Sequence, residues 1–220
     1  MRIPTPPIGE SIYIAGNTNS GKTVLCKYLL SVMALQFRNV IIFQIDYDLN
    51  DPWEDYADIV VNGDLPIDWS LMDSYHILCV DATKLGKTKL RSLWGMVCGV
   101  ALARGRTLLI CDEIARVTDA NSISENHFVM LSGRGRKRQT TLIQAGQRLQ
   151  DCSIQIRTLS KHKFLFRLDD RDAKMYAKLF LDDWRLLLDL KPYHSLYIRP
   201  GFAGKTEVSV LPPCPLIRRE

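Results

Sequence analysis

The chain has 220 residues, of which 46% are apolar and 24% are charged, so it is long enough for one globular domain with a full hydrophobic core. No apolar run reaches the roughly 18 residues of a membrane span, and residues 1–10 lack the apolar centre of a signal peptide, which predicts a cytoplasmic protein without a membrane partner. Six scattered cysteines without a CxxC pair argue against a zinc site and against a disulfide framework.

The charges are distributed unevenly along the chain. Residues 1–130 carry 11 Lys and Arg against 15 Asp and Glu, a net charge of −4, whereas residues 131–220 carry 18 against 9, a net charge of +9. A basic part beside an acidic part is typical of a protein that holds a polyanion on one side. A solvated charged face would give the same pattern, and charge alone does not separate the two.

The first predicted element is a short buried strand, Ile12 to Ala15, which leads into a glycine-rich segment. That segment reads Gly16-Asn17-Thr18-Asn19-Ser20-Gly21-Lys22-Thr23, the Walker A or P-loop pattern GxxxxGKT. A helix is predicted next, because apolar residues recur at helical spacing at Leu25, Leu29, Val32 and Leu35. Glycines let the backbone turn so that successive N–H groups and a helix N-terminus face one phosphate. We therefore expect residues 16–23 to bind a nucleoside triphosphate, with Lys22 on the β- and γ-phosphates and the Thr23 hydroxyl on Mg²⁺.

Strands and helices alternate through the rest of the chain. Strands are predicted at 40–45, 75–80, 107–111, 140–145 and 163–168, helices at 89–104, 124–132 and 170–188, and an acidic loop at 46–56. This alternation predicts an α/β fold, a mainly parallel central sheet with helices on both faces. We expect residues 1–199 to form a single P-loop domain and residues 200–220, which are rich in proline, to form an extended C-terminal arm.

Two acids, Asp112 and Glu113, directly follow the predicted strand at 107–111. In a parallel sheet they emerge at the same edge as the P-loop, where Asp112 can support Mg²⁺ as a Walker B aspartate and Glu113 can polarise the attacking water. Acids at a helix N-terminus are the alternative explanation, and the P-loop favours the catalytic one. No N/TKxD motif that would read guanine is present, which favours ATP over GTP.

Gln147 lies just past the predicted strand at 140–145, on the side where the phosphates are expected. Its amide could donate to the γ-phosphate or position water. A polar loop residue without such a task would have the same spacing, and the sequence leaves both explanations open.

These motifs together resemble the FtsK-HerA superfamily of DNA-translocating ATPases. The resemblance rests on the P-loop, on Asp112-Glu113, on the basic segment GRGRKR, on a strand that ends in AGQRLQD and on FLFRLDDRDA, and it spans about residues 8 to 180. Leu149 stands where the family often has proline. A bare ATPase core of this size is similar to the genome-packaging ATPases of tailless icosahedral double-stranded DNA viruses.

The resemblance implies a RecA-like ATP hydrolase that moves double-stranded DNA of any sequence into a preformed capsid. It also implies a location in host cytoplasm or at a capsid vertex of the virion, with a vertex protein as partner. Its subunits would form a homo-oligomeric ring, a hexamer or pentamer, in which each site receives an arginine from its neighbour. Arg136 is the first candidate for this arginine, before Arg138 and Arg134. These three arginines and Lys137 could instead contact DNA phosphates or be solvated. The sequence favours none of these roles over the others.

Two other functions fit the same motifs. A filamentous-phage-type assembly ATPase exports single-stranded DNA at a membrane, and such proteins generally carry a membrane span that this sequence lacks. A nucleotide-dependent binding switch or assembly factor would hydrolyse slowly and would be indifferent to DNA. Stimulation of hydrolysis by long duplex DNA distinguishes the three.

Overall fold

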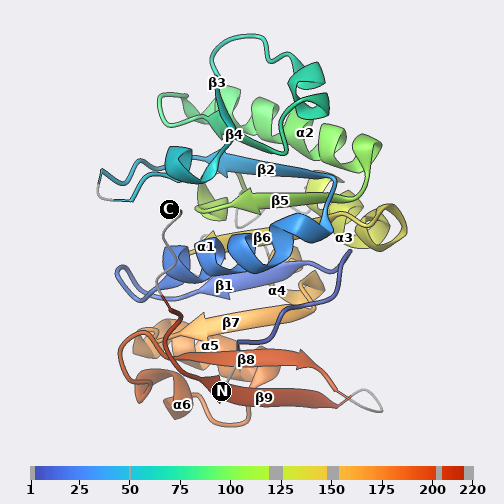
Figure 1. Cartoon of the computed structure of the whole chain (residues 1–220). Helices are drawn as coiled ribbons and strands as arrows, with labels where there is room; N and C mark the ends of the chain where they lie inside the picture. Colours follow the sequence, from blue (N-terminus) through green and yellow to red (C-terminus); the bar gives the residue numbers. More distant parts are fainter. Residues whose placement is uncertain (1–2, 50, 119–125, 148–153, 202–204, 216–220) are drawn as a thin grey trace.

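The computed structural model describes residues 3–49, 51–118, 126–147, 154–201 and 205–215, which fold around one nine-stranded sheet (Figure 1). The strands are β1 (Ile12–Ala15), β2 (Asn39–Gln44), β3 (Ile59–Asn62), β4 (Ile77–Asp81), β5 (Thr107–Cys111), β6 (Thr141–Gly146), β7 (His162–Phe166), β8 (Ser195–Pro200) and β9 (Thr206–Leu211). The α-helices are α1 (Lys22–Met33), α2 (Lys87–Arg104), α3 (Asn126–Arg138), α4 (Ile154–Leu159), α5 (Asp170–Phe180) and α6 (Arg185–Leu188). Short 3₁₀ helices are η1 (Ala34–Gln36), η2 (Trp53–Tyr56), η3 (Trp69–Asp73) and η4 (Ile114–Arg116).

The strand order is β3-β4-β2-β5-β6-β1-β7-β8-β9. Pairing is parallel from β3 to β7, and only β8 and β9 run antiparallel to their neighbours. The predicted α/β fold with a mainly parallel sheet is therefore confirmed. Because β6 lies between β1 and β5, the carboxyl ends of these three strands meet side by side at one edge of the sheet.

Alternate strand residues point to opposite faces of the sheet and enter two hydrophobic cores. Ile41 and Phe43 belong to the core that is covered by α2, α3, α4, α5 and α6. Val40 and Ile42 belong to the core that is covered by α1 and η2. Helices thus cover both faces, as the sequence predicts, and α1 crosses the front of the sheet in Figure 1.

Two local predictions differ from the structure. Helix α3 does not end near residue 132 but continues to Arg138, so the basic segment GRGRKR forms its last turns. Leu35, expected on the apolar face of the first helix, is 90% exposed. It lies in η1, whose tighter winding turns this side chain away from the face that α1 buries.

The prediction of an extended C-terminal arm at 200–220 needs correction for residues 206–211. Residues Thr206–Leu211 form β9, which pairs with β8 from Thr206 to Leu211 in a β-hairpin. An exposed ion pair joins the two strands, with Arg199 Nη2 2.6 Å from Glu207 Oε2. Strand β8 would otherwise be a long unpaired edge, which explains why the alternating EVSVL segment joins the sheet.

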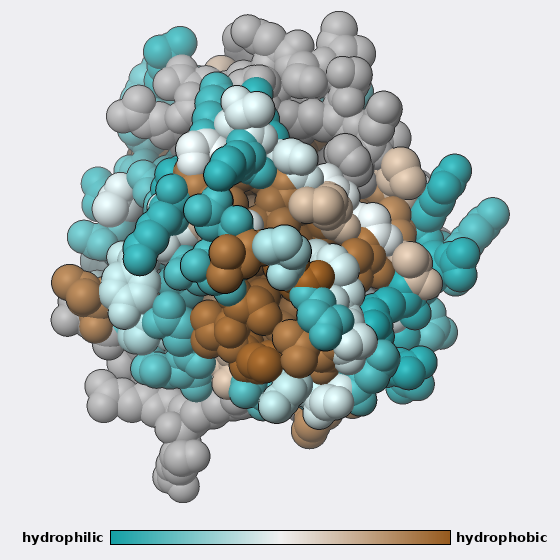
Figure 2. Space-filling model, turned by 90° about the horizontal axis from the view of Figure 1, so that it is seen from above, coloured by the Kyte–Doolittle hydropathy of each residue, from teal (hydrophilic) through white to brown (hydrophobic). Residues whose placement is uncertain are grey.

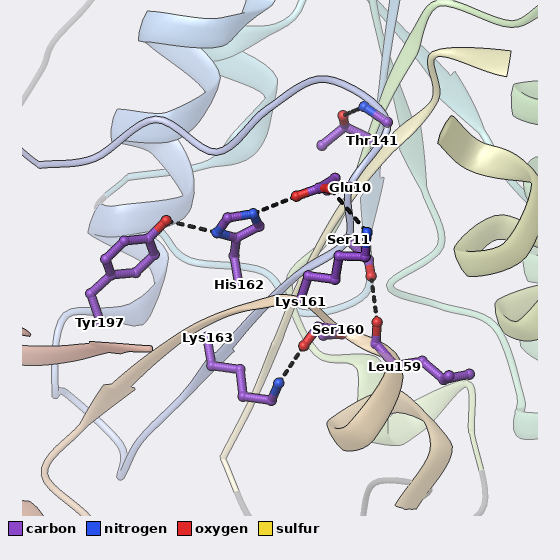
Figure 3. A network of polar contacts seen from close by, with 10 residues as sticks. Glu10, Ser11, Thr141, Leu159, Ser160, Lys161, His162, Lys163 and Tyr197 are labelled. Atoms are coloured by element: carbon purple, nitrogen blue, oxygen red, sulfur yellow. Dashed lines mark hydrogen bonds and ion pairs between the residues drawn. The ribbon is translucent and has the colours of Figure 1, made fainter. Parts of the chain in front are cut away.

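A polar network is buried at the amino-terminal edge of β7 (Figure 3). His162 Nε2 lies 2.7 Å from Glu10 Oε2, and His162 Nδ1 lies 2.7 Å from the Tyr197 hydroxyl oxygen. The carboxylate can only accept, so Nε2 carries the ring proton and the tyrosine hydroxyl donates to Nδ1. Burial lowers the pKa of His162 despite the opposing effect of Glu10. These bonds tie the segment before β1 to β7 and β8.

Two lysines flank this network. Lys161 Nζ donates to Glu10 Oε1 at 3.0 Å, while Lys163 donates to the Ser160 carbonyl and has its pKa lowered to about 8 by burial. Burial also disfavours the charge on Glu10, yet hydrogen bonds from His162 and Lys161 outweigh it and hold the pKa of Glu10 below its ordinary value. The segment before β1 is therefore held in place by an ionised carboxylate.

An apolar groove lies at the β3 end of the sheet, between the loop after β3 and helix α2. Figure 2 views the molecule from this end and shows apolar side chains gathered among hydrophilic ones. Leu65 is 62% exposed and Met96 is 55% exposed, and Ile67 and Leu93 line the groove between them. The longest helix, α2, borders this groove, and neither it nor any other helix in the described ranges is long and apolar enough to cross a bilayer.

Candidate active site

The P-loop connects β1 to α1 and is shaped by its two glycines. Gly21 has a φ of +105°, a conformation that side chains rarely adopt. At Gly16, a Cβ atom would lie 2.6 Å from the Cβ of Phe166 in β7. The Asn17 N–H donates to the Arg167 carbonyl at 3.1 Å, which anchors the loop to the end of β7. The loop therefore requires glycine at both positions and is held against β7.

Lys22 is the first residue of α1 and is only 8% exposed. Its Nζ donates to the Asn17 carbonyl at 2.8 Å, so the ammonium group lies inside the loop. Burial lowers the pKa of Lys22, and the charges of Glu113 and Asp112 oppose this shift. Among the described residues no carboxylate is in direct contact with the Lys22 ammonium. This cation is therefore available to a phosphate held in the loop.

Asp112 follows β5 and reaches both the P-loop helix and a distant aromatic residue. Its Oδ1 lies 3.4 Å from Thr23 Oγ1, and its Oδ2 accepts a hydrogen bond from Trp53 Nε1 at 3.0 Å. Burial raises the pKa of Asp112 although both hydrogen bonds oppose the shift. A cation beside these oxygens would favour the ionised form of Asp112 and so offset the effect of burial. Hydroxyl, carboxylate and phosphate oxygens are ligands that Mg²⁺ prefers. The Thr23 and Asp112 oxygens therefore fit a magnesium ion.

Trp53 was not predicted to belong to the site. It lies in η2, within the segment predicted as an acidic loop, and is 2% exposed. Lys27 Nζ of α1 lies 5.1 Å from the Trp53 ring centre and 2.7 Å from Asp51 Oδ2. These contacts hold the indole against α1 and aim its N–H at Asp112.

Glu113 lines the same cleft as Lys22 and Asp112. Burial raises its pKa to about 7, with Asp112 and Asp46 adding to the rise and Lys22 opposing it. A carboxylate with a pKa near neutrality is suited to accept a proton from water. Glu113 and Asp112 thus line one cleft together with the P-loop residues Lys22 and Thr23.

Gln147 follows β6 and is exposed. Its Oε1 accepts a hydrogen bond from the Thr18 hydroxyl of the P-loop at 3.1 Å. The position of β6 between β1 and β5 explains this contact, because the end of β6 then lies between the P-loop and the two acids. The rest of the AGQRLQD motif, from Arg148 onward, lies outside the described residues.

One cleft at the carboxyl edge of the sheet brings these groups together. Predicted residues that line it are Thr18, Asn19, Lys22, Thr23, Asp112, Glu113 and Gln147. The segment after β2 adds four lining residues that the sequence did not indicate, namely Asp46, Tyr47, Asp48 and Trp53. The alternation of strands and helices predicts which strand ends meet, but not which loop folds over them.

The basic cluster Arg134, Arg136, Lys137 and Arg138 does not reach this cleft. The four side chains are exposed at the end of α3, just before β6 begins. The cleft lies at the other end of β6, and six strand residues span about 20 Å. Arg136 and its neighbours are therefore at the opposite edge of the sheet from the P-loop of the same chain.

Solved structures with this arrangement of strands include viral DNA-packaging enzymes. The DNA-packaging ATPase B204 from Sulfolobus turreted icosahedral virus is 17% identical, with a TM-score of 0.76 over 95% of this chain and 100% of that chain. The genome-packaging NTPase B204 of Sulfolobus turreted icosahedral virus 2, in complex with AMPPCP, is 17% identical, with a TM-score of 0.73 over 93% and 98% of the two chains. This chain has the same fold as these two enzymes.

A further solved structure with this fold is that of a VirB4 protein. VirB4 of Thermoanaerobacter pseudethanolicus is 12% identical, with a TM-score of 0.68 over 93% of this chain and 90% of that chain. A scan against protein-family models and a search of curated proteins gave no match to the sequence. The predicted resemblance to RecA-like ATPases of the FtsK-HerA type is thus confirmed at the level of the fold.

Proposed function

We propose that the chain is an ATP hydrolase that drives double-stranded DNA into a preformed viral capsid. The observation that carries this proposal is the convergence of Lys22, Thr23, Asp112, Glu113 and Gln147 on one cleft from three neighbouring strand ends. The packaging enzymes with the same fold, including a complex with an ATP analogue, support both the nucleotide and the DNA as partners.

Each group in the cleft has a distinct task in this proposal. Backbone N–H groups of residues 16–23 and the ammonium of Lys22 hold the β- and γ-phosphates. Thr23 and Asp112 hold a magnesium ion, which neutralises charge on the phosphates. Glu113 accepts a proton from the attacking water, and its near-neutral pKa suits this step. Gln147, bonded to Thr18, reports the γ-phosphate to the P-loop.

The subunits form a ring in the same proposal, a hexamer or pentamer. An arginine at the amino edge of the sheet can meet a nucleotide only in another subunit, since the cleft of its own chain is at the opposite edge. Arg136 remains the first candidate for this role, before Arg138 and Arg134. The other basic side chains of the cluster are then free to contact DNA phosphates without reading the sequence.

A partner at the capsid vertex and a location in host cytoplasm complete the proposal. Both rest on the packaging enzymes that share the fold rather than on a surface of this chain. Residues 1–199 are proposed to act as one ATPase domain, together with β9 of the C-terminal segment.

The decisive experiment measures ATP hydrolysis with and without long duplex DNA. Glu113→Gln should lower turnover by about 10²- to 10⁴-fold while nucleotide binding is retained, because only the proton acceptor is lost. Glu207→Gln is the matched control, since this exposed residue lies on β9 away from the cleft, and it should leave turnover unchanged.

Other outcomes separate the alternatives. Hydrolysis that is slow and indifferent to DNA would favour a nucleotide-dependent switch over a motor. A strong preference for single-stranded DNA would favour an export ATPase of the filamentous-phage type. Full activity in Glu113→Gln would contradict the assignment of the cleft.

A further inference from the structure

The order of the strands gives a direction to a nucleotide that binds in the cleft. The groups expected on the γ-phosphate side are Glu113, which would polarise the attacking water, and Gln147, and they follow β5 and β6. The P-loop follows β1, whose neighbours are β6 on one side and β7 on the other. A nucleotide with its γ-phosphate toward β6 and β5 therefore extends its base toward the ends of β7 and β8.

An exposed aromatic ring, that of Tyr193, lies on this side of the P-loop. Strand β8 runs antiparallel to β7 and pairs Ser195 with Phe166, so the residues just before β8 lie beside the end of β7. A Cβ atom built on Gly21 would be 3.2 Å from Tyr193 Cδ1 and 3.3 Å from Phe166 Cε1. The Tyr193 ring thus lies close beside the last glycine of the P-loop, yet 55% of the residue is exposed.

The backbone of Tyr193 is strained. The His194 N–H donates to the Lys191 carbonyl at 3.1 Å, which closes a turn with Pro192 and Tyr193 at its centre. Tyr193 has a φ of +62°, at the turn position that glycine usually takes when φ is positive. An aromatic residue is unfavourable there, and such strain concentrates at functional sites. Packing does not explain the tyrosine either, because more than half of the residue is exposed.

We propose that Tyr193 is the platform on which the base of the nucleotide stacks. This inference rests on the proposed function and adds the recognition of the base to that of the phosphates. Stacking uses the π-face that every base has. The turn at 191–194 holds the ring of Tyr193 in place before the nucleotide arrives.

The experiment compares two ligands that differ in whether they carry a base. Affinities for a non-hydrolysable ATP analogue and for inorganic tripolyphosphate are measured on the full chain by calorimetry. Tyr193→Asn removes the ring, and asparagine tolerates a positive φ, so the variant should fold. Tyr193→Phe keeps the ring. Tyr47→Asn tests the opposite direction for the base, because Tyr47 is 53% exposed and lines the cleft on the side of the acids.

Tyr193→Asn should weaken binding of the ATP analogue by about 5- to 150-fold, the range measured for loss of one stacked base. Tripolyphosphate binding should stay unchanged, and Tyr193→Phe should keep the affinity of the wild type for both ligands. An equal loss for both ligands, or no loss, would overturn the inference. A loss confined to the ATP analogue in Tyr47→Asn would overturn it too, because the base would then extend toward the acids. Failure of wild-type protein to bind tripolyphosphate would instead contradict the proposed function.

Discussion

The hydrogen bond from Trp53 to Asp112 gives the sharpest test of how the cleft is built. Trp53→Phe keeps an aromatic ring against Lys27 but removes the only donor that the indole offers to Asp112 Oδ2. A hydrogen bond to a charged group contributes about 1.5–3 kcal/mol, which corresponds to roughly 10- to 150-fold in an equilibrium constant. Loss of a residue that orients a metal ligand typically costs about 10- to 100-fold in metal affinity. We expect a loss in that range for magnesium-dependent nucleotide binding.

The assay is titration of a non-hydrolysable ATP analogue, once with Mg²⁺ and once with a chelator. The ratio of the two affinities measures what the ion contributes, and only this ratio should fall in Trp53→Phe. Trp94→Phe is the matched control, because Trp94 is 4% exposed, packs against Phe43 in the core and is not a partner of Asp112. An unchanged ratio in Trp53→Phe, or the same fall in Trp94→Phe, would refute the claim that the indole aims the carboxylate at the metal.

Three further predictions follow from the same structure. Gly16→Ala should lower the free energy of unfolding by about 1–3 kcal/mol in urea titrations, because the new Cβ would overlap β7, and an unchanged midpoint would contradict the close approach. Acidification below pH 6.5 should destabilise the protein. Burial lowers the pKa of His162 from 6.5, and the pKa of Glu10 is held below 4.5. Because both groups bind protons more readily in the unfolded chain, the free energy of unfolding falls as the pH falls. His162→Gln should remove the part of this loss between pH 6.5 and 4.5, and an identical pH profile in the variant would show that the buried ring does not titrate on unfolding. Arg136→Ala should abolish ATP hydrolysis but not nucleotide binding. Mixing this variant with Glu113→Gln should restore hydrolysis, because one subunit then supplies the arginine and its neighbour the glutamate. Mixtures that stay inactive would exclude Arg136 as the arginine given to a neighbour.

Local sequence was enough to predict the phosphate-binding loop and the class of fold. The P-loop is a run of eight residues whose backbone turns on its own glycines, and Gly21 indeed has a positive φ that the GxxxxGKT pattern leads one to expect. The meeting of Asp112, Glu113 and Gln147 with this loop followed from parallel pairing, because the pattern of apolar runs already fixes where each strand ends. These contacts could be predicted since each depends on one short segment and one rule of sheet topology.

Tertiary structure alone decided the groups that come from irregular segments. Trp53 meets Asp112 across 59 positions of the chain, and Tyr193 reaches Gly21 from a turn that carries no motif. The segment GRGRKR is helical although its two glycines disfavour a helix, and this helix places Arg136 at the edge of the sheet opposite the cleft. Short-range spacing sets backbone conformation and strand ends, whereas the direction of a side chain from a loop depends on packing between parts of the chain that are far apart in sequence. For this reason the sequence predicted the phosphate-binding loop, and the fold was needed to find that Trp53 contacts Asp112 and that Tyr193 lies beside Gly21.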